Sequence, residues 1–93
     1  MALVLFGDFE WESDKAASNV IDHGVSFPEA IPALTDPAAI EEPNAVPARV
    51  TTIGFSETHG ALYVVTTESG VRTRIISARQ AEPKEARRYH EEK

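Results

Sequence analysis

The segment RVTTIGFSETHGALYVVTTESGVRTRIIS, residues 49–77, decides the fold of this chain. It contains three runs rich in valine, isoleucine and threonine, which are residue types that favour β-strands. His59-Gly60 and Ser69-Gly70 separate these runs, and short connections that contain glycine are typical of β-hairpins. The segment therefore predicts an antiparallel meander of three strands, Arg49–Phe55, Ala61–Thr67 and Val71–Ser77.

The residues before the meander predict one strand and one helix. Leu3 to Trp11 begins with an apolar and aromatic run, which is typical of a strand. Ser13 can cap a helix whose apolar residues recur at helical spacing. Gly24 stands where a glycine would end that helix.

A second, shorter helix is predicted from Phe27. Ser26 and Glu29 have the spacing of a capping box, in which each side chain binds the other residue's backbone N–H. Pro32 removes a hydrogen bond from the helix interior, so we expect the helix to end near Leu34.

Residues 35–48 contain three of the six prolines and few apolar anchors, so they are predicted to form a loop. Pro83 suits the first position of a final helix that runs toward Glu91. The predicted order is β-α-α-β-β-β-α, and residues 1–93 are expected to form a single α+β domain.

Composition narrows the function classes. The 93 residues carry a net charge of -6 and contain no cysteine, which excludes disulfides and thiolate metal sites. No apolar run reaches the length of a membrane span, so we expect no membrane contact and a cytoplasmic protein. Lys15 is the one cation among nine acids in residues 1–48, whereas residues 49–93 hold eight cations and six acids. Any polyanion must therefore bind a local cationic site, and the acidic half suits a basic partner protein.

The arginines of the third strand are candidates for binding a phosphate. Cleavage of RNA by its own 2′-hydroxyl needs a base, an acid and a cation beside the phosphate. Arg74 and Arg79 suit the last task, because guanidinium grips two phosphate oxygens and keeps its charge. They have opposite parity along a regular strand, so they can converge only if the strand ends or bulges near Ser77 or Ala78. Arg72 shares a face with Arg74, and a solvated arginine pair is the alternative interpretation.

The last helix offers two further candidates, each with an ordinary structural explanation. Tyr89 could contact a base, or it could anchor the core through a hydrogen-bonded hydroxyl. Arg88 could contact RNA, or it could pair with Glu85 three residues earlier on the helix surface.

His23 closes the first predicted helix. It could transfer a proton near neutral pH, or it could simply interact with the helix dipole. Lys15 could reach a phosphate or pair with a neighbouring acid. His59 and His90 are expected to be exposed. The histidine spacing does not predict a zinc site, and no metal or other cofactor is predicted.

Several motifs, in order and spacing along nearly the whole chain, resemble the BrnT-type toxins of bacterial type II toxin–antitoxin pairs. They are Phe9-Glu10-Trp11-Glu12 with Lys15 and Asn19, His23-Gly24-Val25-Ser26-Phe27 with Glu29-Ala30, Asp36-Pro37, Arg49, Gly54, and Arg74-Ile75-Ile76-Ser77-Ala78-Arg79 with Ala81, Glu85, Arg87 or Arg88, and Tyr89.

The resemblance implies a RelE-like α+β fold and a metal-independent endoribonuclease that blocks translation. It also implies a complex with a BrnA-like antitoxin, through which alone the pair binds operator DNA. On this interpretation Arg74 and Arg79 bind the scissile phosphate, His23 or Glu10 handles protons, and Tyr89 positions a base. The cations expected to contact RNA are Lys15, Arg49, Arg72 and Arg88.

The chain departs from the family pattern at Asp22, where a cation is usual, and at Pro32. These departures leave a second interpretation open, in which the chain is an inactive relative that binds the antitoxin and helps to repress transcription.

Overall fold

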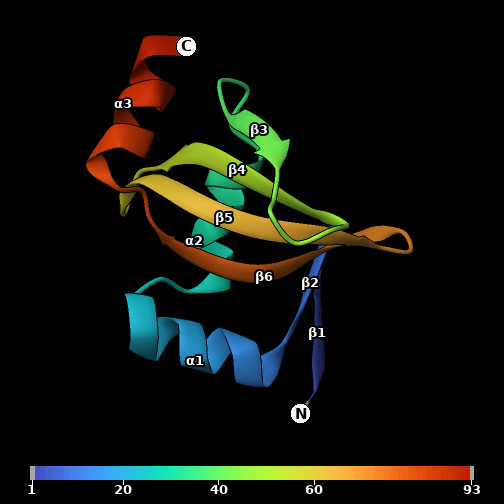
Figure 1. Ribbon diagram of the computed structural model, residues 1–93. Helices are drawn as coiled ribbons and strands as arrows, with labels where there is room; N and C mark the ends of the chain where they lie inside the picture. The colour runs from blue at the N-terminus through green and yellow to red at the C-terminus, as the bar shows by residue number, and fades with distance from the viewer. Residues whose placement is uncertain (1, 93) are drawn as a thin grey trace.

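The predicted meander forms the centre of a six-stranded sheet in the computed structural model, which describes residues 2–92. Its strands are β4 (Arg49–Ser56), β5 (Gly60–Ser69) and β6 (Arg72–Gln80). β4 pairs antiparallel with β5, and β5 pairs antiparallel with β6. The complete strand order is β1-β2-β6-β5-β4-β3. Figure 1 shows β4, β5 and β6 side by side, with β1 and β2 beyond β6. The α+β class is therefore confirmed.

Two details of the predicted order are wrong. The expected first strand is a hairpin of β1 (Leu3–Phe6) and β2 (Phe9–Glu12), which turns at Gly7 with φ 59°. A side chain with a Cβ rarely adopts this backbone conformation. The expected loop contains β3 (Ile40–Pro43), whose proline is tolerated because this strand lies at the sheet edge.

The strands β2 and β6, which lie far apart in the sequence, pair in parallel. Phe9 aligns with Thr73, and Glu10 aligns with Arg74, whereas every other strand pair in the described sheet is antiparallel. A carboxylate from the acidic front half is thereby placed beside an arginine of the cationic tail.

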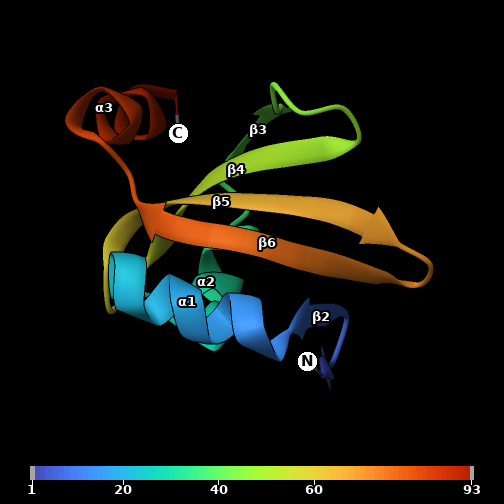
Figure 2. The same cartoon turned by 60° about the horizontal axis from the view of Figure 1, so that its bottom comes forward.

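Two helices cover one face of the sheet, which we call the helical face (Figure 2). They are α1 (Ser13–His23) and α2 (Phe27–Leu34). The capping box of Ser26 and Glu29 is confirmed, and so is the end of α1 at Gly24, whose φ is 71°. The prediction that Ser13 caps α1 is wrong: Glu12 is the N-cap residue, and the Ser13 hydroxyl accepts a hydrogen bond from the Ala2 N–H.

The core lies between the helical face and these two helices. Phe27 is fully buried, and its ring meets the Trp11 ring edge-on at 5.9 Å between centroids. Gly54 lets α2 approach β4 closely, because a Cβ there would lie 2.1 Å from the Ala33 carbonyl oxygen. The other buried members of this core are Val25, Ala30, Leu62, Val64, Ile75 and Ala78.

The last helix, α3 (Pro83–Glu92), lies on the other side of the sheet, at the end where β6 finishes (Figures 1 and 2). It begins at Pro83 as the sequence predicts. The face away from α1 and α2, which we call the open face, is thus covered by α3 at one end.

Candidate functional site

A β-bulge in β6 places the two main candidate arginines on the same face. Thr66 of β5 aligns with Ile75 and Val65 aligns with Ser77, so Ile76 has no partner in the ladder. One extra residue reverses the alternation of side chains beyond it. Arg74 and Arg79 therefore both lie on the open face. Their spacing in the sequence requires such a bulge for the two side chains to converge.

The strand register sets out a row of polar side chains across this face. Glu10 of β2 aligns with Arg74 of β6, which aligns with Thr67 of β5 and, through it, with Arg49 of β4. Directly opposed residues on neighbouring strands share a face. Arg72 lies two residues from Arg74 on the same side, and its Nε donates to the Gly7 carbonyl at 3.1 Å.

Glu10 and Arg74 form the centre of the row. The Arg74 Nε donates to Glu10 Oε2 at 2.7 Å, and Glu10 is only 5% exposed. The hydrogen bond from Arg74 lowers the pKa of the Glu10 carboxyl, although its burial acts in the opposite direction. Glu10 is consequently an ionised proton acceptor, next to a guanidinium that remains partly open to solvent.

Arg79 fastens the end of β6 to the start of α3. Its two terminal nitrogens donate to the Glu85 carboxylate at 2.9 and 3.1 Å, and its guanidinium lies 3.9 Å from the Tyr63 ring centroid. This bidentate hydrogen bonding raises the pKa of Arg79 and lowers that of Glu85. Glu85 also accepts the backbone N–H of Glu82 at the helix start. Arg79 thus has a structural role in addition to any contact with RNA.

Tyr89 is a buried anchor of α3, with 3% of its surface exposed. Its hydroxyl donates to Asp36 Oδ2 at 2.5 Å, and Asp36 also accepts the backbone N–H groups of Ala38 and Phe55. The hydrogen bond to Asp36 and the burial raise the pKa of Tyr89 to about 12. With 3% of its surface exposed, Tyr89 offers little area on which a base could stack.

Arg88 and Arg49 lie toward the β3 edge. Arg88 binds Glu42 of β3, with Nη2 2.8 Å from Oε2, and so links α3 to the sheet edge. Arg49 is half-buried and lines a shallow depression with Glu41, Glu42 and Pro43.

Lys15 and His23 lie beside β6 on the side of α1. Both are exposed on α1 and line a cavity that is closed on the β6 side by Ile76 and Ser77, the residues at the bulge. The free edge of β6 runs between this cavity and the open face. The pair Lys15 and His23 and the row at Glu10 thus adjoin the same short stretch of β6, whereas Arg88 binds Glu42 and Tyr89 binds Asp36.

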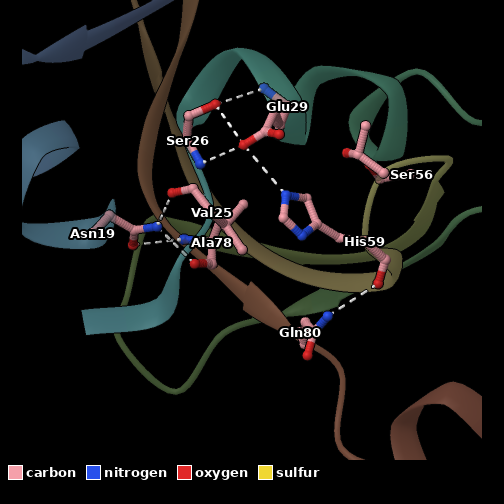
Figure 3. A network of polar contacts seen from close by, with 9 residues as sticks. Asn19, Val25, Ser26, Glu29, Ser56, His59, Ala78 and Gln80 are labelled. Atoms are coloured by element: carbon pink, nitrogen blue, oxygen red, sulfur yellow. Dashed lines mark hydrogen bonds and ion pairs between the residues drawn. The ribbon is translucent and has the colours of Figure 1, made fainter. Parts of the chain in front are cut away.

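The network in Figure 3 holds residues that sequence reasoning missed. The buried Asn19 side chain donates to the carbonyls of Val25 and Ala78, and its oxygen accepts the Ala78 N–H. It therefore takes the place of a neighbouring strand along the β6 edge. A polar residue within the otherwise apolar inner face of α1 was the only signal for this role.

The expectation that His59 is exposed is wrong. Only 18% of its side chain is exposed, and its Nε2 lies 3.2 Å from the Glu29 carboxylate. The hydrogen bonds from Ser26 lower the pKa of Glu29, and the contact with His59 adds to this effect. One carboxylate thus joins the start of α2 to the turn between β4 and β5.

Within residues 2–92, no group of three or more histidine or acidic side chains is arranged to hold a metal ion. In the same part of the chain, every helix is too short or too polar to cross a membrane.

Comparison with known proteins finds a matching family model and similar solved structures. A family model described as the ribonuclease toxin BrnT of type II toxin–antitoxin systems matches residues 11–85. A 1.1 Å crystal structure of the Brucella abortus ribonuclease toxin BrnT is similar in fold, with a TM-score of 0.65 and 24% sequence identity. The similarity covers 77% of this chain and 92% of that one. No curated protein sequence matches.

Proposed function

The chain belongs to the BrnT family of ribonuclease toxins of type II toxin–antitoxin systems, and from this premise we propose that it is a metal-independent endoribonuclease. It cuts RNA in the cytoplasm, blocks translation and is neutralised in a hetero-oligomer with a BrnA-like antitoxin, which alone contacts operator DNA. The observation that carries the proposal is the pairing of Glu10 with Arg74 across β2 and β6, and the bulge at Ile76 places Arg79 on the same open face.

The chemistry centres on Glu10 and Arg74. Glu10 removes the proton of a ribose 2′-hydroxyl, and the oxygen then attacks the adjacent phosphorus. Arg74 stabilises the extra negative charge on the phosphate oxygens. The 5′-oxygen leaves with a proton from an acid, so the products are a 2′,3′-cyclic phosphate and a 5′-hydroxyl. The hydrogen bond from Arg74 keeps Glu10 ionised, as a proton acceptor must be, while the lowered pKa makes the carboxylate a weaker base.

His23 is the proposed acid, since its cavity reaches β6 at Ser77. Three residues of strand separate Ser77 from Arg74, a span of roughly 10 Å. An RNA strand that crosses the free edge of β6 could contact both groups. Arg49, Arg72 and Lys15 then bind neighbouring phosphates, while Tyr89 and Arg88 act by holding α3 in place.

Expression of the chain alone tests this proposal. Growth should stop and RNA should be degraded, and Arg74→Ala should lower the cleavage rate of the purified protein by on the order of 10²-fold. Arg87→Ala is the matched control, because Arg87 is an exposed α3 arginine that forms no ion pair within the described chain. Equal rates for Arg74→Ala and the parent would disprove the assignment.

A second candidate function is an antitoxin-binding module that helps to repress transcription. The specific observation in its favour is that Arg74, Arg79 and Arg88 are each already bound to a carboxylate. A chain that binds the antitoxin but leaves RNA intact at every concentration would establish this alternative.

A further inference from the structure

The two edges of the sheet differ in how they resist pairing with another strand. β3 at one edge carries Glu41, Glu42 and Pro43, and charges and proline discourage edge-to-edge pairing. β1 at the other edge, Leu3-Val4-Leu5-Phe6, has no charge and no proline. Leu3, Leu5 and Phe6 are each at least half exposed, at 50, 55 and 52%. An exposed apolar edge of this kind marks an interaction surface.

The backbone of β1 is also available for pairing. The Ser13 N–H donates to the Ala2 carbonyl at 2.8 Å, so the even-numbered residues of β1 form the hydrogen-bonded pairs with β2. The N–H and C=O groups of Leu3 and Leu5 therefore point away from β2, toward the free edge. An incoming strand could accept from and donate to both residues.

Contacts behind β1 hold it ready for such a partner. Arg72 binds the Gly7 carbonyl, and the Thr73 N–H donates to the Asp8 carbonyl at 2.9 Å, which ties the β1–β2 turn to β6. The Phe6 and Trp11 rings lie 5.8 Å apart. A strand that is ordered before binding loses less conformational entropy when a partner pairs with it.

We propose that β1 pairs with an extended apolar segment of the antitoxin, flanked by lysine or arginine, which adds a seventh strand to the sheet. The proposal rests on the proposed function for the existence of this partner. Residues 1–14 contain four carboxylates and no cation, which suits basic flanks.

The position of β1 relative to the family match adds to this argument. The matched residues begin at 11, so β1 and the start of β2 lie outside them. A strand outside the matched residues can determine which antitoxin binds, and β1 is separate from Glu10 of β2, which binds Arg74. β1 is then a determinant of partner choice.

Binding to the purified protein encoded beside this chain, measured by calorimetry, tests the proposal. Leu3→Lys places a cation against the basic flanks, and Leu5→Pro removes one outward N–H; each should weaken binding at least about 10-fold. Ile21→Lys makes the same change in charge at a residue that is 83% exposed near the end of α1, and it should bind as the parent does. Thermal unfolding should show that all three variants are folded.

The remaining outcomes of this experiment would overturn the proposal. Unchanged affinity in folded Leu3→Lys and Leu5→Pro would show that the antitoxin docks elsewhere, and absence of binding by the parent would remove the partner. A parent chain with twice the 10.2 kDa monomer mass, reduced to the monomer by Leu3→Lys, would assign β1 to self-association. RNA cleavage measured on the same samples reports on the proposed function separately, because β1 contributes no group to that chemistry.

Discussion

Replacement of Asn19 by alanine should destabilise the fold more than any other single change on α1. The side chain makes three buried hydrogen bonds, at 2.9 Å to the Val25 carbonyl and at 2.7 and 3.1 Å to the Ala78 carbonyl and N–H. Each is worth about 1 kcal/mol, and the alanine variant leaves three buried backbone groups without this partner. We therefore expect the free energy of unfolding to fall by about 3 kcal/mol. For a domain of this size the melting temperature should fall by about 12–24 °C.

Urea unfolding followed by circular dichroism measures this loss directly. Ser18→Ala is the matched control, because Ser18 is the exposed neighbour of Asn19 on the same helix, and its replacement should change the stability by less than about 0.5 kcal/mol. A loss below about 1 kcal/mol for Asn19→Ala would refute the view that this side chain replaces a strand at the β6 edge. A change in the slope of the unfolding transition would point instead to an altered unfolded state.

Three further predictions concern packing and pH. Gly54→Ala should lower the unfolding free energy by at least about 3 kcal/mol, because its Cβ would meet the Ala33 backbone. Val50→Ala on the same strand should lower it clearly less. The reverse order of the two variants in urea unfolding would contradict this packing. The pKa of Tyr89, raised to about 12 from 10.0, makes its neutral hydroxyl stabilising below pH 10 and progressively less so as pH rises toward 12. Tyr89→Phe should therefore flatten the alkaline fall in stability, and an unaltered pH profile would speak against this role. The pKa of Glu85 is lowered, so its stabilisation is present above about pH 4.5 and is lost on further acidification; Glu85→Gln should flatten the acid fall in thermal stability, and a parent-like acid limb would disprove it.

Local signals predicted most of the fold from the sequence. The alternation of β-branched residues gave β4, β5 and β6, and Ser26 with Glu29 gave the start of α2. The hairpin at Gly7 was missed although the sequence contained a signal for it: Gly7-Asp8 is a two-residue connection typical of hairpins between two apolar runs. The strand β3 was missed because two glutamates and a proline are poor strand formers, although it pairs with β4, the next strand along the chain.

The candidate site was less predictable, since it depends on register and on pairing between distant residues. The parity of Arg74 and Arg79 showed that a bulge was needed, but its position at Ile76 follows from the alignment of β5 with β6. No spacing along the chain connects Glu10 with Arg74, which are joined by the parallel pairing of β2 with β6. Similarly, the sequence did not indicate that Asp36 would receive the Tyr89 hydroxyl.

The carboxylates bound to Arg74 and Arg79 determine how a nucleic acid could approach this surface. A phosphate that binds both terminal nitrogens of Arg79 must displace Glu85, so RNA association there is an exchange of one anion for another, whereas the Arg74 guanidinium keeps a part open to solvent. Such an exchange releases fewer counterions from the protein than binding to a bare cationic patch, and it discriminates against ligands that offer only one weak anionic group. Displacement of Glu85 from Arg79 would also release the first turn of α3 from β6. Binding of RNA would then change how α3 is held on the sheet.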